Sequence, residues 1–316
     1  MARRTKAKSI NAPRQTSTPA ELVDALNLLF GKQTIGRAIH AKGIILSGRF
    51  TPTPDAARIS KAPHFHEAVS LTARFSNFAG RLDVADTDPL ASPRGLSLKF
   101  HLPDGSDTDL VAHSFNGFPV ATADQFREFV TALARSGPDA RKPTPADLFF
   151  AAHPMAKAFL DEQPPPPVSY ATLAYFGVNS FEFSNADGDS VFGRYRIEPD
   201  AGIQLLSTED RERADHDYLF REIRERVARE PVRFRYRLQL ADATDVIDDP
   251  SVAWPENRRV VDLGTIELTE IAPDNAAAET ALLFQPGPLP DGIAPADPML
   301  QAREDSYKVS FERRHR

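Results

Sequence analysis

The sequence has no cysteine among its 316 residues. This absence excludes disulfide bonds, thiolate nucleophiles, iron–sulfur clusters and cysteine-ligated zinc sites. No apolar run reaches membrane-spanning length, and residues 1–17 are basic and polar, without the apolar stretch of a secretory signal. We therefore expect no membrane span, a cytoplasmic location, and a flexible N-terminal arm over residues 1–17.

Basic residues are in the minority, with 38 Lys and Arg against 44 Asp and Glu and a formal net charge of −6. This balance argues against a nucleic-acid partner, because binding to phosphates depends on basic side chains. The sequence also lacks phosphate-binding glycine loops, a dinucleotide fingerprint and the nucleophile elbow of serine hydrolases. The sequence therefore contains no motif typical of kinases, dehydrogenases or serine hydrolases.

Alternation of apolar and polar residues predicts a fold built mainly on strands. The first strands are expected at 39–50, 69–75, 96–102 and 110–115, and their short links indicate antiparallel pairing. Later strands are expected at 181–183, 191–196, 232–240 and 260–271. Helices are expected at 19–30, 122–134, from 144, at 208–230 and at 298–316. No domain boundary is evident, so we expect residues 18–316 to form one α+β domain, an antiparallel β-barrel of about eight strands with peripheral helices.

The last predicted helix carries the most specific pair of residues. Arg303 and Tyr307 are four positions apart, so both lie on one helix face. A guanidinium there can donate to the phenol oxygen and favour the phenolate, which can ligate ferric iron. On spacing alone, however, an ordinary cation–aromatic pair is the simpler interpretation. His40 is ambiguous in the same way, because a single His beside an apolar run is more often packed than catalytic.

Six short motifs, taken together and in order, give these residues a context. They are Arg37 to Gly43 (RAIHAKG), Arg74 to Gly80 (RFSNFAG), Pro93 to Phe100 (PRGLSLKF), Asp109 to Pro119 (DLV then NGFP), Asp249 to Pro255 (DPSVAWP) and Gly292 to Tyr307 (GIAPADPMLQAREDSY). The set resembles the haem catalase superfamily, in the shortened form called catalase-related peroxidase. The resemblance runs from about residue 35 to the end of the chain.

The resemblance implies that haem b (iron protoporphyrin IX) binds between Tyr307 and His40. Tyr307 would be the axial ligand of the haem iron, and Arg303 would keep it ionised. His40 would move a proton from one peroxide oxygen to the other, with Ser76 bonded to its second ring nitrogen. Asn116 would hydrogen-bond the peroxide, although NGFP stands here in place of the family's usual NNTP.

The resemblance also assigns residues around the cofactor. Arg37, Arg74 and Arg314 would pair with the haem propionates, since guanidinium forks suit carboxylates. Phe129 would pack near the haem face, and Ile39 would narrow the access channel.

The function expected from the resemblance is that of a haem peroxidase. It would reduce hydrogen peroxide or organic hydroperoxides with a small organic electron donor. The sequence stops at Arg316, without the wrapping and C-terminal helical regions of long catalases, so we expect weak catalase activity. Two alternatives stay open. One is a fatty-acid hydroperoxide isomerase or lyase similar to allene oxide synthase, and the other is a non-enzymatic haem-binding or peroxide-sensing protein. The sequence names neither the donor nor the oligomeric state, and a homo-oligomer is among the outcomes it allows.

Overall fold

The computed structural model describes residues 16–32 and 36–315. Its strands are β1 Gly43–Pro52, β2 Val69–Ser76, β3 Gly95–His101, β4 Asp107–His113, β5 Tyr175–Ser184, β6 Ser190–Pro199, β7 Val232–Leu240, β8 Val260–Ile271 and β9 Ile293–Pro295. Its α-helices are α1 Pro19–Phe30, α2 Pro54–Ile59, α3 Ala123–Ala134, α4 Pro145–Ala152, α5 Pro154–Asp161, α6 Thr208–Arg213, α7 Tyr218–Arg229, α8 Asn275–Ala281 and α9 Met299–Arg313. Short 3-10 turns lie at Pro63–Phe65, Pro89–Ala91 and Tyr170–Thr172.

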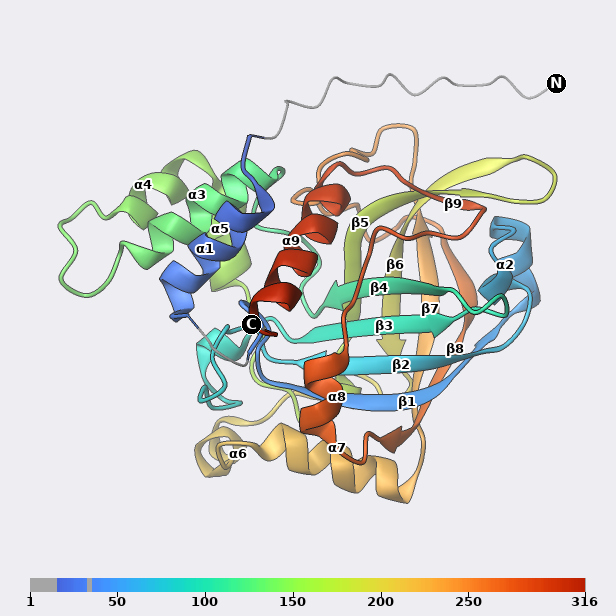
Figure 1. Ribbon diagram of the computed structural model, residues 1–316, viewed down its shortest axis with the longest axis horizontal. Helices are drawn as coiled ribbons and strands as arrows, with labels where there is room; N and C mark the ends of the chain where they lie inside the picture. The colour runs from blue at the N-terminus through green and yellow to red at the C-terminus, as the bar shows by residue number, and fades with distance from the viewer. Residues whose placement is uncertain (1–15, 33–35, 316) are drawn as a thin grey trace.

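The strands form one antiparallel sheet that closes on itself (Figure 1). Its order is β4-β3-β2-β1-β8-β7-β6-β5, and a pairing of His113 with Phe176 joins β4 to β5. The short strand β9 is added to β5. The prediction of an α+β fold with a barrel of about eight strands is confirmed.

The barrel interior is a packed apolar core rather than a channel. In β7, Val232, Phe234 and Tyr236 are buried while Arg233 and Arg235 are exposed, as strict alternation predicts. Inward-pointing residues of the other strands pack on this row and fill the interior. A ligand site must therefore lie outside the barrel interior or at its rim.

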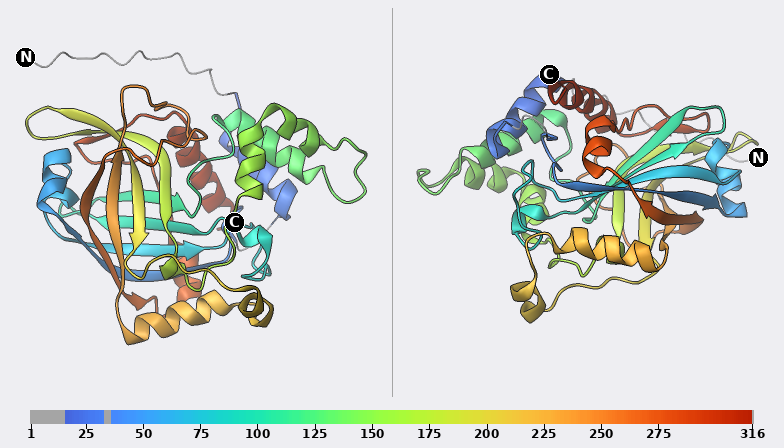
Figure 2. Two further views of the ribbon diagram at one scale, coloured as in Figure 1. Left: turned by 180° about the vertical axis from the view of Figure 1, so that it is seen from behind. Right: turned by 60° about the horizontal axis from the view of Figure 1, so that its bottom comes forward.

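The helices lie around the barrel in separate groups (Figures 1 and 2). The helices α1, α3, α4 and α5 pack on one another beyond one end of the barrel, and α9 contacts α1. The helix α7 packs on β8, and α8 packs on β1. The helix α9 thus lies beside both the α1 group and the barrel, and it brings the last described residues of the chain next to α1.

Two predicted elements differ from the structure. The strand expected at 39–50 begins only at Gly43, because residues 38–41 form a bend that includes His40. The single exposed helix expected at 208–230 is two helices, and α7 buries Tyr218, Leu219 and Ile223. These three residues recur at helical spacing among charged ones, so the dense charge hid an amphipathic helix that packs on the barrel.

The N-terminal arm falls mostly outside the described residues, since residues 1–15 are not among them. At its end, the backbone amides of Thr16 and Ser17 donate to the carboxylate of Asp124, at 2.9 and 2.6 Å. Those last two residues of the predicted arm are therefore tied to α3. The prediction of a single domain over residues 18–316 stays a prediction.

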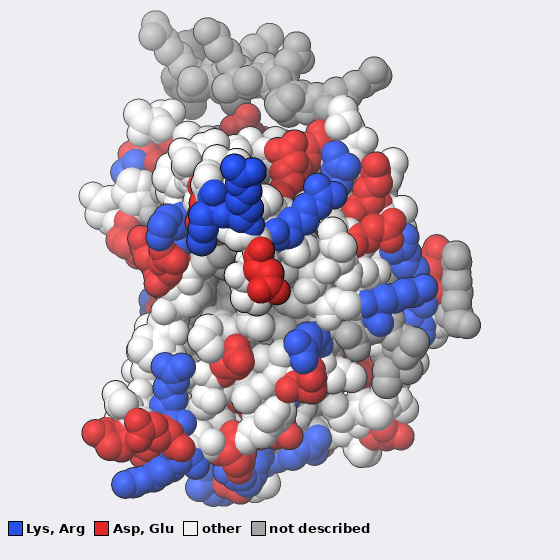
Figure 3. Space-filling view, turned by 90° about the vertical axis from the view of Figure 1, so that its left-hand side faces the viewer, with Lys and Arg blue, Asp and Glu red and all other residues white. Residues whose placement is uncertain are grey.

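The surface over the helical group carries charges of both signs. Figure 3 shows Lys and Arg interspersed with Asp and Glu on this face. Ion pairs such as Arg127 with Glu21, at 3.7 Å, and Lys142 with Asp147, at 3.2 Å, join them. In the described ranges, no helix combines the length and apolarity needed to cross a lipid bilayer.

Gly48 provides a test of the barrel register. It lies at an irregularity where β1 shifts by one position against β8, and a Cβ there would overlap the carbonyl oxygen of Glu267. We expect Gly48→Ala to lower the free energy of unfolding, measured by urea denaturation, by about 1–3 kcal/mol. Gly137→Ala, whose Cβ would meet nothing within 4 Å, is the matched control and should stay within about 0.5 kcal/mol of the starting protein. Equal stability of the two variants would contradict this register.

Candidate active site

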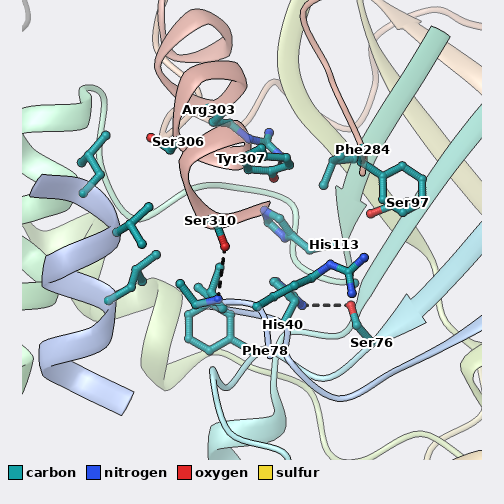
Figure 4. A pocket seen from close by; sticks show the side chains of 18 of the residues that line it. His40, Ser76, Phe78, Ser97, His113, Phe284, Arg303, Ser306, Tyr307 and Ser310 are labelled. Carbon is teal, nitrogen blue, oxygen red and sulfur yellow. Dashed lines mark hydrogen bonds between the residues drawn. The ribbon is translucent and has the colours of Figure 1, made fainter. Parts of the chain in front are cut away.

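A cavity lies between the rim of the barrel, α1 and α9 (Figure 4). Its wall brings together segments from both ends of the sequence. Of the residues predicted from the sequence, the following eight line it: Arg37, Ile39, His40, Arg74, Ser76, Arg303, Tyr307 and Arg314. In Figure 4, Tyr307 and Arg303 project from α9 on one side, while His40 and Ser76 lie on the other.

On the α9 side, Arg303 is held between two partners. Its Nη2 donates to the phenol oxygen of Tyr307 at 2.9 Å, and its Nη1 donates to Oδ1 of Asn179. Asn179 in turn donates to the carboxylate of Asp297 at 2.7 Å. Because this chain of bonds fixes the guanidinium, a charged donor is directed at the phenol oxygen of Tyr307.

The start of α9 anchors the same network to the barrel. Asp297 accepts the backbone N–H of Met299 at 2.8 Å, and Met299 and Leu300 are buried at the first turn. Burial raises the pKa of Asp297 to about 6. The acceptor of Asn179 therefore sits in a desolvated position, where hydrogen bonds are worth more than in water.

On the opposite side, the backbone of His40 adopts a left-handed conformation with φ of 55°. This geometry is strained for a residue with a side chain. Hydrogen bonds hold it in place: the amide donates to the carbonyl of Phe78 at 2.8 Å, and the carbonyl accepts Nη2 of Arg74 at 2.8 Å. Strain supported in this way is typical of functional positions.

The imidazole of His40 is oriented by its neighbours. Its Nδ1 lies 3.1 Å from the hydroxyl of Ser76, at hydrogen-bond distance. A Cβ at Gly95 would lie 2.9 Å from that same nitrogen, so only glycine leaves room for the ring. The ring plane is set further by Phe78, whose centroid is 5.5 Å away in an edge-on contact.

His40 is neutral at pH 7. The ring faces the cavity but lies deep in the protein, and this desolvation holds the pKa of His40 well below its usual value. The guanidiniums of Arg74, Arg303 and Arg37 lower the pKa of His40 further, and so would a proton on the neighbouring imidazole of His113. A neutral imidazole at neutral pH can accept a proton, which suits a general base.

Three arginines gather at one end of the cavity around one carboxylate. Glu279 of α8 accepts Nε of Arg74 at 2.7 Å and also pairs with Arg37. The carbonyl of Leu282 accepts from Arg37 and from Arg314, each at 2.8 Å. Three guanidiniums against one carboxylate leave two positive charges. Nε of Arg314 is buried and has no partner among the described residues, so this cluster is set to receive an anion.

The charges of this cluster persist at neutral pH. Burial lowers the pKa of Arg37 to about 9 and that of Arg314 to about 10, both still above 7. Burial alone would raise the pKa of Glu279, but the guanidiniums of Arg74 and Arg37 outweigh it and lower the pKa. At physiological pH the arginines are therefore protonated and Glu279 is ionised, which leaves the cluster with two surplus positive charges.

Two predicted residues are not in the cavity wall. Asn116 donates its amide to Glu256 at 3.0 Å instead, because a bond of 3.1 Å from Phe118 N to Pro250 O draws this loop towards the 250 segment. Phe129 is buried among the helices and contacts Phe126. α3 turns Phe126 to the cavity. The cofactor contact of Phe129 and the peroxide contact of Asn116 stay predictions.

Sequence reasoning missed four residues of this site: His113, Asn179, Glu279 and Asp297. His113 ends β4 and lines the cavity. A polar residue closing a buried strand, directly after the D-L-V motif, was the available signal for it. The other three lie in segments whose pattern gives no sign that they meet an arginine.

The family model described as Catalase matches residues 18–316. The chain belongs to the catalase family. It is 35% identical over 302 residues to a protein of Mycolicibacterium paratuberculosis named "Catalase-related peroxidase", with 94% of this chain and 95% of the other covered. A protein of Synechococcus elongatus with the same name is 33% identical, with 95% and 89% covered. The prediction of a shortened catalase-like protein is confirmed.

Long catalases share less with this member of the catalase family. The "Catalase" of Sus scrofa is 28% identical, and the match covers 89% of this chain but 56% of the other. A solved structure titled "Crystal structure of a Fungal Catalase at 1.9 Angstrom" superposes with a TM-score of 0.78 at 22% identity, over 96% of this chain and 66% of that one. At that identity the likeness shows the fold alone.

Membership of the catalase family implies a haem cofactor, and the cavity residues fit one. A phenol and an imidazole stand on opposite sides of the cavity, as one axial ligand and one acid–base group require. The two surplus positive charges match the two propionates of a haem. Apart from these polar and charged groups, the wall of the cavity is mostly apolar, and its residues include Leu22, Leu26, Phe126 and Met299.

Replacing Glu279 tests the charge cluster through stability. Its folded-state pKa is lowered from a usual 4.5, so the ionised form stabilises the fold above that pH, and the contribution is lost as pH falls through the folded value. We expect Glu279→Gln to reduce the free energy of unfolding of the haem-free protein by about 1–3 kcal/mol at neutral pH, with the difference shrinking in acid.

The matched control is Glu267→Gln, because Glu267 pairs with Arg233 at 2.7 Å on the exposed barrel surface. An exposed pair contributes at most about 1 kcal/mol. If the two variants lost equal stability, or if the loss in Glu279→Gln did not depend on pH, the cluster would not have the charge state described.

Proposed function

We propose that the chain is a haem peroxidase, which reduces hydrogen peroxide or an organic hydroperoxide with a small organic donor and has weak catalase activity. The observation that carries the proposal is the placement of Tyr307, with Arg303 donating to it, across one cavity from His40. Membership of the catalase family supports the broader statement, an oxidoreductase that acts on peroxide.

The residues that would hold haem b follow from the donor groups. Tyr307 would supply the oxygen ligand to the iron, and Arg303, which donates to that oxygen, would stabilise its negative charge when it binds the metal. Arg37, Arg74 and Arg314 would receive the propionates. When bound, haem supplies the redox chemistry, taking the oxidising equivalents of the peroxide and passing them to a donor.

His40 would carry the proton. Its Nδ1 is engaged with Ser76 at 3.1 Å, which leaves Nε2 for the peroxide. As a neutral base it would take a proton from one peroxide oxygen and return it to the other, so that the second oxygen would leave as water when the O–O bond breaks with electrons that haem would supply. Ser76 positions the ring and does not touch the peroxide itself.

The peroxidase part of the proposal is supported by the relatives named as peroxidases, which this chain matches over nearly their whole length. The largely apolar wall also suits an organic donor better than it suits a second molecule of peroxide. A cytoplasmic location and a homo-oligomeric assembly stay predictions of the sequence.

The assignment of Tyr307 is tested by spectroscopy. Addition of haem to the purified protein is expected to give a Soret band at one haem per chain. Tyr307→Phe removes the oxygen ligand and is expected to shift the ferric spectrum and weaken haem retention. Tyr218→Phe is the control, because Tyr218 does not line the cavity and its hydroxyl donates to Pro167 O; it should leave the spectrum unchanged. An identical Soret band in Tyr307→Phe would refute the ligand.

The pH profile tests His40. Because its pKa lies well below the usual value of about 6.5, the basic form persists as pH falls through that value. We expect the rate of reaction with hydrogen peroxide, followed by stopped-flow at the Soret band, to stay level down to about pH 6 and to fall only in more acidic solution. His40→Ala should be about 10²–10⁴-fold slower. An acid limb centred at or above pH 6.5 would contradict the lowered pKa.

The alternatives separate with one further substrate. A fatty-acid hydroperoxide consumed rapidly without any reductant would favour the isomerase or lyase. A haem-loaded protein that reacts with peroxide no faster than His40→Ala would favour a binding or sensing role. Turnover that depends on an added phenol supports the proposal made here.

A further inference from the structure

A second imidazole, that of His113, borders the same cavity. Its side chain is buried, with 9% exposed, and neither ring nitrogen has a hydrogen-bond partner among the described residues. In Figure 4 the ring lies between Tyr307 of α9 and His40. A buried imidazole with both nitrogens unpaired loses about 1–3 kcal/mol for each group, so its position needs a reason.

The barrel register explains how His113 reaches the cavity. Gly95 of β3 pairs with Ser76 of the neighbouring strand β2 and with His113 of the other neighbouring strand, β4. Residues directly opposite one another in a sheet share a face. Ser76, which orients His40, and His113 therefore stand in one row across three strands, and the glycine between them leaves the space open.

Apolar contacts fix the ring without using its nitrogens. Phe159 meets it edge-on with centroids 6.0 Å apart, and Phe118 lies at 6.3 Å. Phe159 also contacts Phe78, which packs on His40. The two imidazoles are thus held in one aromatic frame, with the polar edge of His113 left for a ligand in the cavity.

His113 is uncharged at neutral pH. Burial, followed by the positive charge of Arg303, lowers the pKa of His113 to about 3. His40 faces it from the bend before β1, and a proton on His113 would lower the pKa of His40. A neutral imidazole presents one N–H donor and one acceptor.

We propose that His113 acts together with His40 on the side of the cavity opposite Tyr307. Its neutral imidazole donates an N–H hydrogen bond to a peroxide, or to another small oxygen or halide ligand, held beside His40. The inference rests on the proposed function. No proton is transferred at His113, since the bond only orients the ligand and disperses charge on its outer atom. His113 would take the role that the family resemblance assigns to Asn116, whose amide donates to Glu256.

Fluoride binding tests this donor without turnover. Fluoride binds ferric haem and accepts hydrogen bonds, so its dissociation constant, measured by Soret titration of the haem-loaded protein, reports on the donor. His113→Phe keeps an aromatic ring but no N–H, and we expect its dissociation constant to rise about tenfold. His113→Asn restores a donor and should stay within about threefold of the original protein.

The reaction with hydrogen peroxide provides the second measurement. We expect His113→Phe to react about 10²-fold more slowly, and His113→Asn to recover most of that rate. Because the donor is neutral His113, its effect should not depend on pH in this range. The ratio of the reaction rates of His113→Phe and the original protein should therefore stay constant from about pH 6 to about pH 8.

The matched control is His64→Phe. His64 is another buried His with an unpaired ring nitrogen, but it packs among Phe50, Phe65 and Phe100 away from the cavity. The variant His64→Phe should change neither the dissociation constant of fluoride nor the rate of reaction with hydrogen peroxide. An original protein that takes up no haem would overturn the proposed function together with this inference. Haem-loaded His113→Phe with unchanged fluoride affinity, or His113→Asn as impaired as His113→Phe, would overturn this inference alone.

Discussion

The bond from Arg303 to the phenol of Tyr307 is the interaction on which the cavity depends. It joins two residues of one helix, but its geometry is set by Asn179 of β5 and by Asp297, just before α9. The orientation of the Arg303 guanidinium is therefore fixed by contacts with the barrel strand β5. Because α9 is anchored through buried Met299 and Leu300, its far end carries Arg314 to the arginine cluster. One helix thus supplies both the phenol and part of the anion-binding charge.

The same positive charges have two effects on the site. They leave a surplus that can neutralise the two carboxylates of a cofactor, and they lower the pKa of His40. Glu279 limits the surplus, since without its carboxylate Arg37 and Arg74 would repel each other at close range. A dianion bound at the cluster would weaken the repulsion felt by His40. The proton affinity of His40 is in this way linked to occupation of the cluster.

The sequence predicted most of the fold because its strands alternate cleanly. β7 and β8 appear where Val232 to Leu240 and Val260 to Ile271 predict them. It also predicted the pair His40 and Tyr307, since each lies in a motif whose spacing is local. Asn116 and Glu279 could not be placed in this way, because what each contacts is decided by loops distant in sequence. The sequence pattern does not separate Phe126 from Phe129, since both lie on the apolar face of α3, and the packing of the helix decides that Phe126 lines the cavity.

The register of the barrel explains how His113 reaches the cavity. β4 ends at this residue, which pairs with Gly95 of β3 and with Phe176 of β5. Beyond it the chain leaves the strand, and Ser114 N donates to Arg94 O at 2.8 Å. The following loop returns to the cavity wall at Phe118, while Asn116, earlier in that loop, donates to Glu256. The imidazole that borders the cavity is therefore placed by the sheet itself, whereas the side chain of Asn116 is placed by its loop.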